Sequence, residues 1–89
     1  MTDEDEIQII YKKGIEAFRR GELQKASGLL LQVVETTEED HHAWNALGVV
    51  FTKMGKYEDA DVCFENALIL DPSNEVYMRN RERNKGHIK

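Results

Sequence analysis

The sequence has one cysteine, one proline and no long apolar run, and each shortage excludes a class of protein. Cys63 alone cannot form an internal disulfide, so the chain is not a small secreted domain held by disulfides. No apolar stretch reaches the roughly 20 residues that cross a bilayer, so membrane association is not expected. The acidic start, Met1–Glu6, lacks the basic and apolar regions of a secretory signal, which predicts a cytoplasmic protein.

Basic residues are also in deficit, with 12 Lys and Arg against 17 Asp and Glu and a net charge of −5. Nucleic-acid binding requires clustered cations, so nucleic acid is not expected as a partner. The exception is the end of the chain, where the basic residues are Arg79, Arg81, Arg83, Lys85 and Lys89. At 89 residues the chain is one small domain, and its stability depends on its core or on self-association.

Groups that could form a catalytic or metal site are scarce. The sequence has no nucleophile–base arrangement and no phosphate-binding glycine loop, so neither an enzyme nor a cofactor is predicted. His41 and His42 are adjacent, and neighbours on a helix point about 100° apart, so we interpret them as a solvated helix start rather than a metal site. Cys63 has no nearby His or basic group in the sequence and is interpreted as a structural thiol.

What the sequence does contain is strong helical periodicity, with few alternating runs and no hairpin turn signal. We predict five helices. The first, Asp3–Arg20, is capped by Thr2, with Asp5 completing a capping box. The others are predicted at Leu23–Thr36, at Asp40–Met54 with Asp40 as a cap, at Tyr57–Leu70, and from just after Asn74 to fraying beyond Arg83. Gly21 and Gly55 are predicted to end helices in the left-handed conformation.

Small residues recur in the chain at a fixed offset of 34 positions. The identical pairs are Gly14 and Gly48, Gly21 and Gly55, and Ala26 and Ala60. Large apolar residues stay in step, since Ile10 falls on Trp44, Leu23 on Tyr57, Leu30 on Phe64 and Val33 on Ala67. A mid-helix glycine costs about 1 kcal/mol relative to alanine, so Gly14 and Gly48 are predicted to permit close approach of two helix backbones.

Residues 41–74 resemble the tetratricopeptide repeat. The residues that carry the resemblance are Trp44, Leu47, Gly48, Phe51, Gly55, Tyr57, Ala60, Phe64, Ala67 and Pro72. Residues 7–40 match more loosely, at Ile10, Gly14, Ala17, Gly21, Leu23, Ala26, Leu30 and Val33. Lys13 stands at the position of Leu47, and Glu38 stands at that of Pro72.

The resemblance implies an all-α fold, a short right-handed α-solenoid of antiparallel helix pairs. It divides the chain into an acidic N-terminal cap (1–6), repeat 1 (7–40), repeat 2 (41–74) and a C-terminal capping helix with a basic tail (75–89). About three repeats are usually needed for stability, and here there are two with a partial third.

The resemblance also implies a concave groove lined by the first helix of each pair. Carried over position by position, the groove residues are Gln8, Tyr11, Ile15, Phe18, His42, Asn45, Val49, Thr52, Val76, Arg79 and Arg83. The implied function is a non-enzymatic adaptor or scaffold that binds a peptide segment of another protein. A competing interpretation is that Ile15 and Phe18 only pack inside the first helix pair.

One subgroup of the family binds a C-terminal carboxylate with Lys, Asn and Arg side chains at fixed groove positions. The matching residues here are Tyr11, Ile15, Ala46, Val76 and Asn80. Four of these cannot bind a carboxylate as charged or amide groups would, so a carboxylate clamp is not predicted.

An alternative function is self-association. After Val76, Tyr77 and Met78, the fifth predicted helix has no apolar residue at the positions of Leu47 and Phe51. It should therefore cover the fourth helix for only about one turn and leave an apolar patch. This hypothesis is a weak homodimer built from the last two helices, with the basic tail reaching acidic residues of the second copy.

Overall fold

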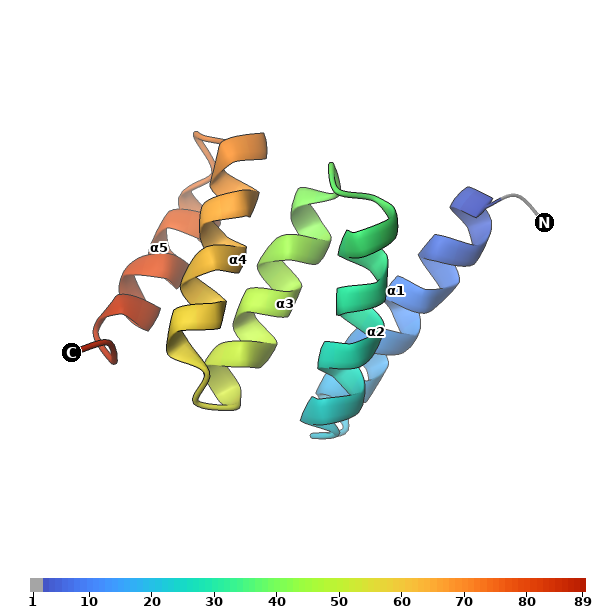
Figure 1. Cartoon of the computed structure of the whole chain (residues 1–89), viewed down its shortest axis with the longest axis horizontal. Helices are drawn as coiled ribbons and strands as arrows, with labels where there is room; N and C mark the ends of the chain where they lie inside the picture. The colour runs from blue at the N-terminus through green and yellow to red at the C-terminus, as the bar shows by residue number, and fades with distance from the viewer. Residues whose placement is uncertain (1–2) are drawn as a thin grey trace.

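The computed structural model describes residues 3–89 and contains five α-helices in this part of the chain, with no strand (Figure 1). The helices are α1 (Asp3–Arg19), α2 (Leu23–Thr36), α3 (His41–Lys53), α4 (Tyr57–Leu70) and α5 (Glu75–Lys85). The predicted all-α class is confirmed. The predicted Thr2 cap and its capping box with Asp5 lie outside the described residues.

The helices form a solenoid of antiparallel pairs. Helix α1 packs on α2 and α3 packs on α4, while α2–α3 and α4–α5 contacts join the pairs in sequence order. Helices α1, α3 and α5 run in one direction, from top to bottom of Figure 1, and both α1–α3 and α3–α5 are in contact. The array is elongated, with extents of 44 × 28 × 17 Å. We call α1, α3 and α5 the inner helices.

Local signals place the helix ends. Gly21 and Gly55 follow the ends of α1 and α3 with φ of 79° and 78°, which confirms the predicted left-handed conformation. The Asp40 side chain accepts a hydrogen bond of 3.0 Å from the Ala43 amide and caps α3 as predicted. Asn74 caps α5 in the same way, accepting from the Tyr77 amide at 3.0 Å.

The two mid-helix glycines of the 34-residue repeat, Gly14 and Gly48, each make room for a large side chain of the next helix. A Cβ added at Gly14 would lie 2.9 Å from Leu30 Cγ, and one added at Gly48 would lie 2.6 Å from Phe64 Cε1. Leu30 and Phe64 are both fully buried, at matching repeat positions. The predicted close approach is therefore present, but the glycines face side chains rather than the opposite backbone.

The core takes residues from all four helices of the two pairs. In α2 the buried residues are Ala26, Leu30, Val33 and Val34, and in α3 they are Ala43, Leu47, Gly48 and Val50. Helix α4 adds Ala60, Cys63, Phe64 and Ala67. These residues recur at helical spacing on one face of each helix, so the periodic pattern that predicted the helices also predicts their buried faces.

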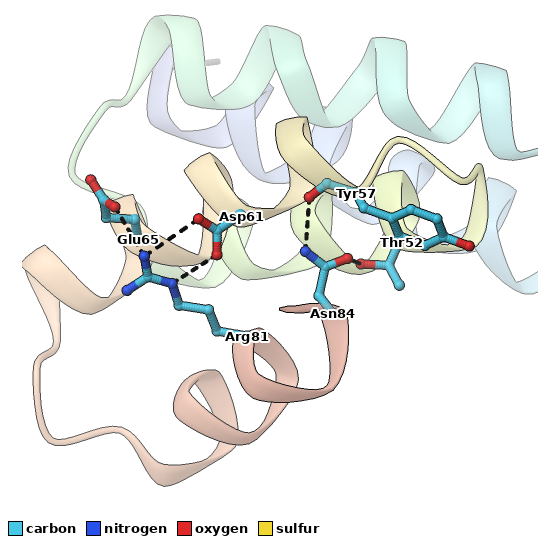
Figure 2. Close-up of polar contacts among 6 residues, drawn as sticks. All are labelled: Thr52, Tyr57, Asp61, Glu65, Arg81 and Asn84. Atoms are coloured by element: carbon cyan, nitrogen blue, oxygen red, sulfur yellow. Dashed lines mark hydrogen bonds and ion pairs between the residues drawn. The ribbon is translucent and has the colours of Figure 1, made fainter. Parts of the chain in front are cut away.

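The prediction that α5 covers α4 for only one turn is wrong. Tyr77 and Asn84 are both buried, and Asn84 lies near the end of the helix. Figure 2 shows the reason: the Asn84 amide donates to the Tyr57 carbonyl oxygen at 2.8 Å and accepts from the Thr52 hydroxyl at 2.8 Å. A buried amide with both ends hydrogen-bonded can replace an apolar side chain at such a position.

An ion pair fixes the outer side of α5. Arg81 Nε lies 2.9 Å from Asp61 Oδ1, and Arg81 Nη2 lies 3.0 Å from Glu65 Oε2 (Figure 2). The hydrogen bond from Arg81 lowers the pKa of the Asp61 carboxyl, so the pair persists until the pH falls below the ordinary titration range of an aspartate. Beyond the helix, the His87 ring stacks on Tyr57 with a centroid distance of 4.6 Å.

Candidate functional site

Two adjacent hollows lie between the inner helices. The first, of about 350 Å³, lies between α1 and α3 and is lined by Tyr11, Ile15, Phe18, Arg19, His42, Asn45, Ala46, Val49 and Val50. The second, of about 330 Å³, lies between α3 and α5 and is lined by Val49, Thr52, Lys53, Tyr57, Phe64, Asn80, Arg83, Asn84 and His87. Val49 lines both hollows, so they are neighbours, and together we call them the inner-helix groove.

Most of the residues predicted for a groove lie in it. The structure brings together Tyr11, Ile15, Phe18, His42, Asn45, Val49, Thr52 and Arg83. Gln8 instead lines a separate hollow with Thr36 and Asp40. Val76 and Arg79 line neither half of the groove. Whether the grouped residues bind a partner stays a prediction.

Ile15 and Phe18 both pack inside the first helix pair and line the groove, so the two interpretations of these residues are compatible. Each is half-buried and packs against the core, and each also lines the first half of the groove. Their inner edges therefore stabilise the first helix pair, while their remaining surface forms the apolar floor of the hollow. Tyr11 is similar, and burial followed by the nearby Asp40 charge raises the pKa of its hydroxyl, which keeps that group protonated at neutral pH.

Two predicted groove residues are also part of the joint between α3 and α5. The Asn80 amide donates to Asn45 Oδ1 at 3.0 Å. The Thr52 hydroxyl contacts its own helix at the Gly48 carbonyl, 3.0 Å away, as well as Asn84. Asn45 and Thr52 therefore fix α5 on α3, a structural role that the sequence did not predict.

The histidine pair belongs to the same joint, which corrects its interpretation as a solvated helix start. The Tyr77 hydroxyl lies 2.8 Å from His41 Nδ1 and 3.2 Å from His42 Nδ1. Burial raises the pKa of the Tyr77 hydroxyl, and a protonated hydroxyl can donate to one ring while accepting from the other. Within residues 3–89, no group of three His, Cys, Asp or Glu side chains is arranged to hold a metal ion.

Sequence reasoning missed Arg19, Lys53 and His87, which also line the groove, and named Ala46 and Asn80 only as positions of a clamp that it did not predict. Arg19 and Lys53 each directly follow a predicted groove residue. The groove is wider than one side chain per helical turn, so the residues next to the predicted ones should have been included. Cys63 lies outside the groove in the core, where burial raises the pKa of its thiol to about 12. Its interpretation as a structural thiol is confirmed.

A further hollow, of about 400 Å³, lies on the other side of the array between α2 and α4. It is lined by Leu31, Val34, Glu35, Glu38, Trp44, Asn66, Ile69 and Leu70, and we call it the outer hollow. The Trp44 indole donates to the Glu38 carbonyl oxygen at 2.9 Å and is therefore held at the edge of this hollow.

No helix among the described residues is long and apolar enough to cross a membrane.

The antiparallel helix pairs and the groove between their inner helices define a helical-repeat protein. The family model described as tetratricopeptide repeat matches residues 42–74, the segment that carries the full signature. The chain belongs to the tetratricopeptide repeat family. Repeats of this family generally mediate protein–protein interactions, and the family is a non-enzymatic interaction module.

Similar proteins occur in a fungus, a bacterium and an archaeon. The chain is 33% identical over 66 residues to Protein bimA of Emericella nidulans, covering 74% of this chain and 7% of that protein. It is 30% identical over 54 residues to TPR repeat-containing protein YvcD of Bacillus subtilis, covering 61% and 11%. It is 30% identical over 61 residues to Uncharacterized protein MJ0572 of Methanocaldococcus jannaschii, covering 68% and 71%. The chain thus spans only a small part of the first two relatives.

Proposed function

We propose that this protein is a cytoplasmic adaptor or scaffold that binds a peptide segment of another protein in the inner-helix groove. The observation that carries the proposal is the adjacency of the two hollows, which share Val49 and together span all three inner helices. Two successive hollows of this kind fit an extended or helical segment, because successive side chains of such a segment can enter them.

The first half of the groove provides the apolar contact that a bound segment needs. Tyr11, Ile15, Phe18 and Val49 line it with aromatic and aliphatic surface. An aliphatic or aromatic side chain placed there removes apolar surface of both partners from water, which is the main favourable term in such association. The hydrogen bonds between α3 and α5 hold the second half in place before a partner arrives, which reduces the entropy lost on binding.

The groove does not have the composition of a carboxylate clamp. Ile15 and Ala46, at two of the clamp positions, are apolar and line the hollow. Asn80, at a third, is hydrogen-bonded to Asn45. We therefore propose recognition of an internal or side-chain-dominated segment rather than of a free chain end.

A pair of matched substitutions tests the groove. We expect Val49→Lys to abolish binding of most peptides selected on the wild-type chain from a displayed random library of about twelve residues. The lysine stem extends into the point where the two hollows meet and carries a charge into the apolar floor. The readout is the fraction of selected peptides that still bind, with circular dichroism to confirm that the variant is folded.

The control is Val62→Lys, the same change on the exposed surface of α4, where the side chain is 58% exposed. Peptide binding by this variant should match the wild type. If the selected peptides bind folded Val49→Lys as well as they bind Val62→Lys, the groove is not the binding site.

Self-association is the second candidate function, and exposed apolar side chains near the C-terminal end support it. Val62 and Ile69 of α4 and Val76 of α5 are each more than half exposed. Exposed apolar residues that gather in one region mark association sites. On this hypothesis the chain sediments as a dimer at about 100 μM, and Ile69→Glu sediments as a monomer. A wild-type monomer at that concentration would remove self-association as the function.

A further inference from the structure

We infer that the peptide recognised by the inner-helix groove is acidic, with Asp or Glu side chains flanking its apolar anchor. This inference deepens the proposed function and rests on it. The charged residues that line the groove are Arg19, Lys53 and Arg83, and among the described residues no Asp or Glu lines either half. The chain as a whole has more acidic than basic residues, so the charge of the groove is opposite to the net charge of the chain.

The three cations lie at one edge of the groove. Arg19, Lys53 and Arg83 each belong to the last turn of an inner helix, and the inner helices run in one direction (Figure 1). They therefore form a basic row beside the apolar floor. Arg79 lies one turn before Arg83 on the same face of α5 and extends the positive field of this row.

Cations in a last turn have an ordinary explanation, since they complement the negative end of the helix dipole. That explanation applies equally to every helix of the array. However, α2 and α4 have no basic residue in their last turn. Because α2 and α4 lack the last-turn cation that α1, α3 and α5 all have, helix stability alone does not account for the basic row.

The three side chains are also available to a ligand. The salt bridges found within residues 3–89 involve Arg20 and Arg81, and none involves Arg19, Lys53 or Arg83. All three side chains are exposed. A carboxylate reaching any of them gains a charge-assisted hydrogen bond without breaking an existing ion pair. The row differs from the positions of a carboxylate clamp, so it recognises acidic side chains along a segment rather than a chain end.

The experiment uses the full chain and the same displayed random peptides. We expect the selected peptides to be enriched in Asp and Glu relative to the unselected library. The triple reversal Arg19→Glu, Lys53→Glu and Arg83→Glu should shift the enrichment to Lys and Arg. It should also lower the affinity for the peptides selected on the wild-type chain by about tenfold or more, measured with synthetic copies of those peptides by fluorescence polarisation. Binding to the wild type should weaken as NaCl is raised.

The matched control is a second triple reversal, Lys13→Glu, Arg20→Glu and Lys25→Glu. These cations line a different hollow, between α1 and α2, which also contains Glu16 and Glu22. The control changes the net charge equally but leaves the groove intact, so it should retain acidic peptides with less than about a threefold loss of affinity. Where the groove reversal does not fold, the neutral variant Arg19→Gln, Lys53→Gln and Arg83→Gln takes its place and should lose both affinity and salt dependence.

The outcomes separate this inference from the function on which it rests. Selected peptides that depend on Val49 but show no excess of Asp and Glu would overturn the acidic preference and leave the groove as the binding site. Equal losses in the two triple reversals would also overturn it, because a general charge effect would then explain the binding. Selected peptides that do not depend on Val49 would instead overturn the proposed function. Enrichment that inverts only with the groove reversal supports the inference.

Discussion

Replacing Phe64 with alanine is expected to lower the free energy of unfolding by about 3–5 kcal/mol, the range for a buried aromatic. Phe64 is 1% exposed and is among the largest fully buried side chains, and its ring fills the slot left by Gly48. A domain of this size has a total stability of only about 5 kcal/mol or a little more, so the variant should keep only about 2 kcal/mol or less and unfold at a much lower urea concentration. Urea unfolding followed by circular dichroism measures the loss.

Val62→Ala is the matched control, since Val62 lies on the exposed side of the same helix. Its free energy of unfolding should stay within about 0.5 kcal/mol of the wild type. A loss below about 1 kcal/mol for Phe64→Ala would mean that the ring is not in the core, and the packing of α4 described above would be wrong.

The second large effect is expected for Gly48→Leu, which should cost about 3 kcal/mol or more. Even a Cβ at this position would lie 2.6, 2.8 and 2.9 Å from three atoms of the Phe64 ring. Because the Phe64 ring is only 1% exposed, a leucine here must displace the ring or separate α3 from α4. Thermal unfolding of the variant, followed by circular dichroism, measures the loss.

Gly28→Leu provides the comparison within the same protein. Gly28 lies in α2, and a Cβ added there meets no atom within 4 Å. Leucine should leave the stability unchanged or raise it by up to about 1 kcal/mol, because glycine disfavours a helix interior. If the two leucine variants melted at the same temperature, the close contact at Gly48 would be ruled out.

Much of the fold could be predicted because its determinants are local. Gly21 and Gly55 end helices through their own backbone conformation, and Asp40 caps α3 through a residue three positions away. The buried faces follow from the spacing of apolar residues along each helix. A close helix contact at Gly48 could be inferred from a glycine where alanine would be the better helix former, but its partner, the Phe64 side chain, could not.

The packing of α5 could not be predicted in this way, because it depends on polar pairs far apart in the sequence. Arg81 and Asn84 stand where the second repeat has Leu47 and Val50, and a hydropathy pattern counts both as exposed. They are covered because Asp61, Thr52 and Tyr57 supply their partners. Nothing in the sequence near Asn84 indicates that these partners lie beside it.

The groove was predictable in outline and not in detail. The repeat register places Tyr11, Phe18 and Val49 on one surface, since equivalent positions on parallel inner helices face the same way. The register does not tell which polar residues already have partners. The sequence predicts that Asn45 and Thr52 are free to contact a bound peptide, whereas in the structure both form hydrogen bonds to α5. The basic row was missed because Arg19 and Lys53 fall one position beyond the residues that the register selects.

The most direct test of the groove is an NMR titration of the isotope-labelled chain with one of the selected peptides. We expect the largest amide shift changes at groove residues of all three inner helices, with Ile15, Val49 and Asn80 among them. Leu31, Ile69 and Leu70 at the outer hollow should change little. Changes concentrated at the outer hollow, with the groove unaffected, would contradict the account and place binding on the opposite side of the array.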